Sequence, residues 1–218
     1  KIGNGVTHLK EGDTVILHWR KGNGIESSTP VYSRKGSKVN AGWVTTFNNY
    51  AVVSENRLTK VDSGLDLVTA PLLGCALTTG FGVIQNDAAL SIGESIVIFG
   101  SGGIGLSMIQ AAKLRGAYPI IAIDRFDGRL SLAMDHGADF IINSSSEKDI
   151  RTSILALTKG NLDVFIDNTG VPEVMELGYK LINKYGRLVL VGVPRHDVKL
   201  SIHTLPLHFG KIITGSEG

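Results

Sequence analysis

The glycine-rich segment Gly100-Ser101-Gly102-Gly103-Ile104-Gly105 has residue types and a spacing that could hold a phosphate. It follows the apolar stretch Ile96–Phe99 and precedes a segment with helical periodicity. A second apolar stretch, residues 119–123, then leads to Asp124. A strand, the pattern G-x-G-x-x-G, a helix and a strand ending in an acid are together typical of dinucleotide-binding proteins, whereas the glycines alone would be a weak signal. The segment therefore predicts a nucleotide cofactor site.

Each glycine of this motif has its own expected role. Gly100 allows the chain to turn tightly after the strand, Gly102 lets the backbone approach a pyrophosphate, and Gly105 lets the helix pack closely against the sheet. The helix N-terminus then offers N–H groups and a partial positive charge to the phosphates. The same cofactor-binding loop includes Ser101, Gly103 and Ile104.

Asp124 bears on the choice between the two nicotinamide cofactors. A carboxylate at this position accepts hydrogen bonds from the ribose hydroxyls of NAD and repels the 2′-phosphate of NADP, for which an Arg is preferred. Arg125 follows directly. We interpret it as a solvated side chain or a stack on the adenine, with partial tolerance of NADP as the alternative. Arg129 either reaches the cofactor or is a charge on a helix surface.

The composition is typical of a globular chain and disfavours several classes of function. With 218 residues, 43% of them hydrophobic and 19% charged, the chain has enough apolar material for a core. A net charge of +2 does not favour nucleic acid or a membrane surface as a partner. We expect no membrane span and no signal peptide. The single cysteine, Cys75, excludes an internal disulfide framework and favours a cytoplasmic location.

Beyond residue 78 the chain alternates between predicted strands and predicted helices. This alternation predicts an α/β fold with a doubly wound parallel sheet. The expected strands are residues 96–99, 119–123, 140–142, 162–166, 187–191 and 211–214. The expected helices are residues 103–115, 127–136 and 172–183, with one more that starts at a capping box in residues 144–147 and ends near Gly160.

The first third of the chain has a different pattern. Residues 1–60 are rich in glycine and β-branched residues and lack helical periodicity. Residues 15–19 and 50–53 are predicted to be strands of a small barrel, and residues 21–40 a long polar loop. Residues 70–82 are predicted to form a linking helix. The expected domains are therefore residues 1–77 and 78–218.

Several segments outside the glycine motif resemble the medium-chain dehydrogenases, specifically the zinc-dependent alcohol dehydrogenases. The matching segments follow that family's order and spacing over nearly the whole chain. They are residues 9–15 (LKEGDTV), 74–82 (GCALTTGFG), the glycine motif, 123–124 (ID) and 186–194 (GRLVLVGVP). The resemblance implies a Rossmann NAD-binding domain in residues 78–218 and part of a GroES-like β-barrel catalytic domain in residues 1–77.

The resemblance also implies an activity and the roles of further residues. The activity is an NAD-linked hydride transfer between an alcohol and an aldehyde or ketone, in which a catalytic zinc polarises the substrate oxygen. Cys75 is implied to be a thiolate ligand of that zinc, and Thr79 to lie against the nicotinamide. The other implied cofactor contacts are Thr169, Gly170, Val191, Gly192, Val193 and Ser216, and also Asn168, whose position varies in character among such enzymes.

The sequence departs from the family pattern in two ways. In this family the other catalytic zinc ligands and the proton relay precede the stretch that matches Lys1–Val15, and a C-terminal segment follows the last Rossmann strand. Because a catalytic zinc needs three protein ligands, we interpret the chain as a fragment and expect the 218 residues alone to be inactive. Residues 20–40 stand where many relatives bind a structural zinc through four cysteines. They contain no cysteine, so we expect no structural zinc.

Two alternative functions stay open. One is a zinc-free relative such as a quinone or enoyl reductase, although the setting of Cys75 and the presence of Asp124 argue against it. The other is a dinucleotide-binding module without catalysis. The expected partners are a small alcohol or aldehyde and further copies of the chain, as a homodimer or homotetramer. The sequence does not identify the alcohol.

Overall fold

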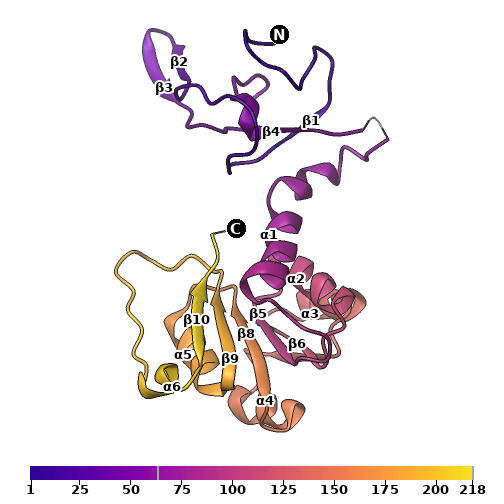
Figure 1. Cartoon of the computed structure of the whole chain (residues 1–218), viewed down its shortest axis with the longest axis vertical. Coiled ribbons are helices and arrows are strands. Elements are labelled where there is room, and N and C mark those ends of the chain that lie inside the picture. The colour runs from indigo at the N-terminus through magenta and orange to yellow at the C-terminus, as the bar shows by residue number, and fades with distance from the viewer. Residues whose placement is uncertain (63, 218) are drawn as a thin grey trace. The chain divides into compact units, whose positions relative to one another are not determined.

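The computed structural model describes residues 1–62 and 64–217. The chain forms two compact units, Lys1–Cys75 and Ala76–Gly218, which Figure 1 shows in indigo to purple and in magenta to yellow. The sequence predicts functional domains at residues 1–77 and 78–218, and this division remains a prediction. Within the described residues, none of the helices combines the length and the apolar character that a bilayer span requires.

The second unit is built around a six-stranded parallel sheet. Its strand order is β10-β9-β8-β5-β6-β7. The strands are β5 (Ile96–Phe99), β6 (Ile120–Asp124), β7 (Phe140–Asn143), β8 (Leu162–Asp167), β9 (Ile182–Leu190) and β10 (Ile212–Gly215). β5 pairs with β6 on one side and with β8 on the other, so the order of the strands reverses there. In open α/β sheets, ligands bind at the carboxyl ends of the strands beside such a reversal.

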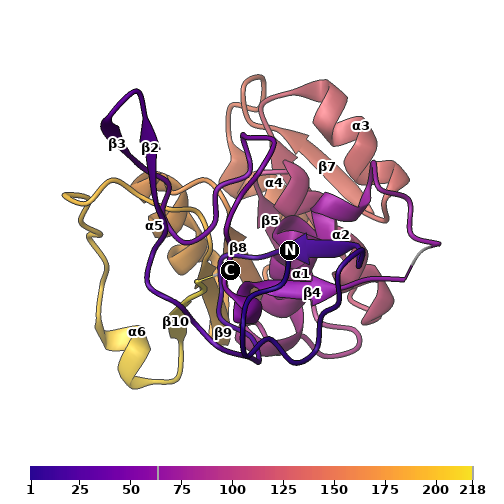
Figure 2. The same cartoon turned by 90° about the horizontal axis from the view of Figure 1, so that it is seen from above.

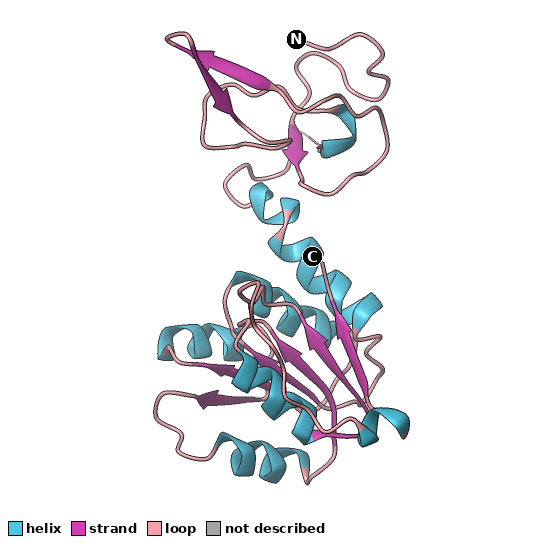
Figure 3. Ribbon diagram, turned by 90° about the vertical axis from the view of Figure 1, so that its left-hand side faces the viewer, coloured by secondary structure: helices cyan, strands magenta, loops and turns pink. Residues whose placement is uncertain are grey.

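Helices cover both faces of this sheet (Figure 3). The helices on one face are the π-helical turn η3 (Val83–Asp87), α2 (Gly103–Leu114) and α3 (Asp127–Asp135), and α1 (Ala76–Gly82) packs against α2. Those on the other are α4 (Ile150–Thr158), α5 (Pro172–Leu181) and the short α6 (Leu205–His208). Helices are needed on both faces because the inner strands β5, β6 and β8 bury side chains on both faces.

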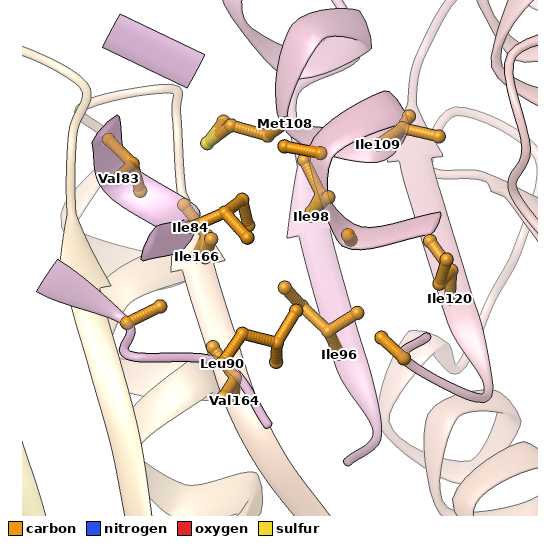
Figure 4. Close-up of a cluster of buried hydrophobic side chains, with 14 of the residues drawn as sticks. Val83, Ile84, Leu90, Ile96, Ile98, Met108, Ile109, Ile120, Val164 and Ile166 are labelled. Carbon is orange, nitrogen blue, oxygen red and sulfur yellow. The ribbon is translucent and has the colours of Figure 1, made fainter. Parts of the chain in front are cut away.

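Side chains of the central strands alternate between two cores. Ile96 and Ile98 of β5 pack under α2 and η3, where Figure 4 shows them beside Met108 and Ile84. The residues between and after them in β5 enter the core under α4 and α5. All four residues of β5 are buried, which explains why the sequence has a continuous apolar run there rather than an alternating one.

The first unit has little regular structure. Two antiparallel pairs form, β1 (Val15–Leu17) with β4 (Leu58–Lys60) and β2 (Val31–Arg34) with β3 (Ser37–Asn40). The β2–β3 hairpin lies apart from the β1–β4 pair (Figure 2). The unit also contains two short 3₁₀ helices, η1 (Glu55–Arg57) and η2 (Ala70–Gly74). The described strands of this unit do not close into a barrel.

Glu55 holds the loops of the first unit together. Its buried carboxylate accepts backbone hydrogen bonds from Thr7 (2.6 Å), Ile25 (2.9 Å) and His8 (3.2 Å), and it lies 2.9 Å from the His8 ring nitrogen Nδ1. The backbone N–H groups of Thr7 and Ile25 are the main cause that lowers the pKa of Glu55 to about 2, against the desolvation that raises it. The ionised carboxylate is therefore the form that the fold stabilises.

Replacing Glu55 with Gln is expected to lower the stability of the fold at neutral pH and to flatten its acid dependence. A carboxyl whose pKa is lower in the folded state contributes stability above its ordinary pKa of 4.5, and this contribution is lost as the pH falls toward 2. The amide of Gln cannot accept from every donor that faces it. Urea unfolding between pH 7 and pH 2.5 measures both effects. Exposed Glu11 supplies the control Glu11→Gln, and equal acid slopes for wild type and Glu55→Gln would contradict the assignment.

The predicted Rossmann strands and helices are confirmed, with limits that differ by a few residues. The largest shift is at β9, which begins at Ile182 rather than at the predicted residue 187. The preceding helix, α5, ends at Leu181 rather than near Asn183. The predicted capping box at residues 144–147 is wrong. Asp149 caps α4 instead, since its side chain accepts from Thr152 N at 3.0 Å and from Thr152 Oγ1 at 2.6 Å.

Three predictions for the first third and the link are wrong. Residues 50–53 form no strand, and Val52 N donates to the Tyr32 hydroxyl instead of to a strand partner. The predicted loop at residues 21–40 contains the β2–β3 hairpin, whose turn places both Lys35 and Gly36 at positive φ. The predicted linking helix is interrupted at Cys75, which has non-helical dihedral angles between η2 and α1.

Candidate functional site

A cavity of about 440 Å³ opens at the carboxyl ends of β5, β6 and β8. Its position matches the reversal of strand order in the sheet. The cavity brings together many of the residues that the sequence analysis selected. It is lined by Phe99, Gly100, Gly102, Asp124, Arg125, Arg129, Ser144, Asn168, Thr169, Val171 and Val174.

The glycine loop forms one wall of this cavity and leads directly into α2. Gly102 is the N-cap residue, and its carbonyl accepts the first helical hydrogen bond from Leu106 N at 2.8 Å. A Cβ atom at Gly102 would have no heavy atom within 4 Å, so the backbone is open on this side. A Cβ atom at Gly105, in contrast, would collide with the Gly100 carbonyl oxygen. The two glycines therefore have different roles. Packing requires a glycine at position 105, whereas Gly102 leaves space that a ligand could occupy.

Ser101 connects the glycine loop to Asp124. It is fully buried, and its backbone N–H donates to Asp124 Oδ2 at 2.9 Å. Its hydroxyl oxygen is buried and has no hydrogen-bond partner among the described residues. A buried hydroxyl beside the open face of Gly102 and the N-terminus of α2 fits a site that a ligand completes.

Asp124 ends β6 with a buried carboxylate. Besides the bond from Ser101, Asp124 Oδ1 accepts from Phe126 N at 3.1 Å, and Arg129 approaches Oδ2 at 3.5 Å. A carboxylate offers about four acceptor positions, so these three donors leave room for a further hydroxyl. Displacement of the long Arg129 contact would leave room for two.

Two guanidinium groups flank the aromatic ring that follows Asp124. Arg125 and Arg129 lie 4.9 Å and 5.0 Å from the centre of the half-exposed Phe126 ring. Both arginines also line the cavity. The structure thus places one acid and two cations at the β6 end of the site, a combination that could receive a ribose or a ribose phosphate.

The turn after β8 forms the opposite wall. Asn168 donates its backbone N–H to Phe99 O at 2.9 Å and its side-chain amide to Gly100 O at 3.1 Å, which ties this turn to the glycine loop. Thr169 and Asp167 are joined within the turn, since Asp167 Oδ1 accepts from Thr169 N at 3.0 Å and from Thr169 Oγ1 at 2.6 Å. Gly170 N donates to the other carboxylate oxygen at 3.0 Å. Burial raises the pKa of the Asp167 carboxyl, and the Thr169 and Gly170 bonds oppose this rise.

The loop after β9 packs against this turn. Val191 N and Gly192 N both donate to the backbone carbonyl of Asp167, at 2.8 Å and 3.0 Å. A Cβ atom at Gly192 would collide with Gly170 N, so the two backbones touch here. Val193 follows and is 93% exposed. Ser216 comes directly after β10, and its N–H donates to Leu190 O at 2.9 Å.

Thr79 and Cys75 are not among the residues that line this cavity. Thr79 is buried in α1 beside Gly80, where a Cβ would come within 2.5 Å of Ser107 of α2. Cys75 is exposed and is the last residue of the first unit. Within residues 1–62 and 64–217, no three His, Cys, Asp or Glu side chains are grouped so that they could hold a metal ion. The described residues therefore fit a dinucleotide but do not supply the three ligands of a catalytic zinc.

Comparison with known proteins identifies the family. A family model described as zinc-binding dehydrogenase matches residues 103–216, which is just over half of the chain. The chain belongs to the zinc-binding dehydrogenases. The resemblance of this chain to the medium-chain, zinc-dependent alcohol dehydrogenases, which the sequence segments predict, is thereby confirmed.

Individual relatives agree with this assignment. The chain is 33% identical to alcohol dehydrogenase class-2 isozyme 2 of Oryctolagus cuniculus, over 99% of the chain and 65% of the relative. It is 31% identical to S-(hydroxymethyl)glutathione dehydrogenase of Saccharomyces cerevisiae, over 90% of the chain and 53% of the relative. The zinc-binding dehydrogenase chain thus spans between about half and two thirds of the length of these relatives.

The fold prediction is also confirmed by a solved structure. Benzyl alcohol dehydrogenase from Acinetobacter calcoaceticus matches with a TM-score of 0.86 and 30% identity, over 99% of this chain and 65% of that one. The match includes both the Rossmann unit and the first unit. The predicted fold class, a Rossmann sheet with part of a GroES-like domain, therefore holds for this member of the family.

The cavity contains residues that the sequence analysis did not select. Phe99, Ser144, Val171 and Val174 line it, and Asp167 organises one of its walls. Val171 and Val174 could have been found from their place at the start of a helix that follows a strand end. Asp167 resembles an ordinary turn residue in sequence, and its burial and the three donors around it distinguish it.

Proposed function

We propose that this zinc-binding dehydrogenase binds NAD and takes part in hydride transfer between an alcohol and an aldehyde or ketone. The observation that carries the proposal is the cavity in which Asp124 and the open backbone at Gly102 lie on neighbouring strand ends. An acid for the ribose and a helix N-terminus for the phosphates are the two features that a nicotinamide dinucleotide requires. The family assignment supports the same chemistry.

The residues in and around the cavity have separate tasks in this proposal. The N–H groups at the start of α2 bind the pyrophosphate. Ser101 N holds the Asp124 carboxylate through its 2.9 Å hydrogen bond, and Asp124 accepts hydrogen bonds from the adenosine ribose. Thr169, Val171 and Val174 exclude water from the adenosine side. Thr79, Gly170, Val191, Gly192, Val193 and Ser216 are proposed to contact the nicotinamide half. The bound NAD supplies the hydride acceptor, which the side chains of this chain cannot provide.

NAD is proposed as the preferred cofactor over NADP. Asp124 would face the 2′-phosphate of NADP with a like charge. Arg129 partly compensates that charge through its 3.5 Å contact, and Arg125 lies beside the same ring. We therefore expect a preference for NAD that is smaller than the acid alone would give.

Cys75 is the one residue of this chain for which a role in zinc binding is proposed. We propose that Cys75 is one ligand of a catalytic zinc in a polypeptide that supplies the remaining ligands. The described residues group no three side chains that could hold this metal. The substrate is proposed to be a small alcohol or its carbonyl product, as the names of the relatives indicate for those proteins.

A homodimer in the cytoplasm is the proposed state of the protein. β10 forms one edge of the sheet, and apolar side chains are exposed on it and before it, at Leu205, Phe209 and Ile212. An edge strand with exposed apolar residues is a surface on which a second sheet edge can pair. The single cysteine supports a reducing compartment.

Fluorescence titration with NADH tests the proposal on the chain itself. Saturable binding at one site is expected, with about tenfold weaker binding of NADPH. ADP is expected to compete, because it contains the adenosine and pyrophosphate that the cavity is proposed to hold. The absence of NADH binding by folded protein would refute the proposal. A preference for NADPH would instead favour a zinc-free reductase.

A further inference from the structure

Asp167 is a fully buried acid that the proposed reaction does not use. It lies at the carboxyl end of β8, between Phe99 of β5 and Leu190 of β9 in the register of the sheet. Burying a carboxylate costs free energy unless hydrogen bonds compensate it. An acid retained at this place therefore needs a local explanation.

The hydrogen bonds of the Asp167 side chain all go to one turn. Thr169 donates twice to Oδ1 and Gly170 donates once to Oδ2. The Thr169 hydroxyl in turn accepts from Val171 N at 3.1 Å. The carboxylate thus fixes three consecutive residues, and two of them, Thr169 and Val171, line the cavity.

The main chain of Asp167 also holds the loop that follows the neighbouring strand, β9. Its carbonyl accepts from Val191 N and Gly192 N, and the backbones of Gly170 and Gly192 are in contact. One residue therefore connects the turn after β8 with the loop after β9. Through the neighbouring Asn168 the same turn also reaches the glycine loop at Gly100.

We propose that Asp167 is a positioning residue of the dinucleotide site, which sets the wall formed by Thr169–Val171 without touching the cofactor itself. The inference rests on the proposed function, because it assumes that the cavity holds a dinucleotide. It adds a residue that acts through its neighbours rather than by contact. The affinity for NADH then depends on an acceptor at each of the two carboxylate oxygens.

Asp163 provides a matched control on the same strand. It lies at the opposite end of β8, and its carboxylate also receives three donors: Ser95 N at 2.9 Å, Ser95 Oγ at 2.8 Å and Asn183 Nδ2 at 2.7 Å. In both Asp167→Asn and Asp163→Asn, an amide N–H₂ group replaces one acceptor and faces a donor. Both variants are therefore expected to lose stability by a similar mechanism.

The experiment measures NADH affinity and thermal unfolding for wild type and both variants. We expect both melting temperatures to fall, while only Asp167→Asn raises the Kd for NADH, by about tenfold. Wild-type affinity in folded Asp167→Asn would overturn the inference. An equal loss of affinity in Asp163→Asn would also overturn it, because general destabilisation would then explain the result. Failure of the wild type to bind NADH would refute the proposed function as well.

A milder pair of variants covers the case in which Asp167→Asn does not fold. Thr169→Val keeps the shape of the side chain but removes the hydroxyl that joins Asp167 to Val171 N, whereas Thr169→Ser keeps the hydroxyl. We expect a loss of about threefold in NADH affinity for Thr169→Val and a smaller loss for Thr169→Ser. If the two variants bind NADH equally well, the hydroxyl bridge does not position the wall and the inference is overturned.

Discussion

Gly102→Val is expected to abolish measurable NADH binding while leaving the fold intact. A Cβ atom at Gly102 meets no heavy atom within 4 Å, and the residue has φ of −75°, which any L residue adopts. The protein can therefore accept the larger side chain. The valine would instead occupy the space that the pyrophosphate needs at the N-terminus of α2, so the loss should exceed about 100-fold in affinity.

Two further glycine variants make this test specific. Gly64 also has open space around its Cβ position but lies in the first unit, so Gly64→Val should retain NADH binding. Gly105→Val should instead destabilise the fold, because its Cβ would collide with the Gly100 carbonyl oxygen. NADH titration and thermal unfolding of the three variants separate the two effects. Retained binding in Gly102→Val would show that the glycine loop does not hold the phosphates.

The Rossmann unit was predictable from sequence because its signals are local. β5 is a short, fully buried apolar run, and the glycines after it allow the tight turn into a helix that other residues would disfavour. Asp124 could be placed in the site because the carboxyl ends of parallel strands meet at one edge of the sheet. The cavity brings Asp124, Gly102 and Thr169 together as that reasoning requires.

The first unit was predicted poorly because its structure depends on distant contacts. The apolar pattern of residues 50–53 predicts a strand, but a strand also needs a neighbour, and the described residues give it none. Glu55 joins segments that are 30 and 48 residues away in sequence, and no short-range pattern predicts such bonds. The β2–β3 hairpin was missed because its turn is Lys35-Gly36 rather than the more typical Asn-Gly or Asp-Gly.

The site residues divide along the same line. Most of the proposed contact residues follow from motif and resemblance, whereas Phe99, Ser144, Val171 and Val174 of the cavity and the residues that act through other residues do not. Asp167 differs from a solvated turn acid only by its burial and by the direction of three donors. Arg129 differs from a surface charge on a helix by its approach to Asp124 and by its place in the lining of the cavity. Both distinctions require the positions of side chains.

Asp124→Asn is expected to weaken NADH binding by about tenfold and to strengthen NADPH binding, so that the preference for NADH is lost. The amide accepts fewer hydrogen bonds from the ribose, and the negative charge that repels the 2′-phosphate is gone. Arg125 and Arg129 line the same cavity as Asp124, and in the variant they would meet a 2′-phosphate there without a competing acid. The ratio of the two dissociation constants is the quantity to measure.

A second acid separates this charge effect from loss of stability. Asp139 accepts from Ile120 N at 2.9 Å and lies 3.4 Å from Lys113 Nζ, so it has a backbone donor and a cation as Asp124 does. It precedes β7 at the opposite end of the sheet from the cavity, and Asp139→Asn should lower stability without changing the NADH-to-NADPH ratio. An unchanged ratio in Asp124→Asn would contradict the role of Asp124 in the choice of cofactor. Arg129→Ala in the wild-type background is expected to increase the preference for NADH, because the acid would then face the 2′-phosphate without the 3.5 Å contact of Arg129.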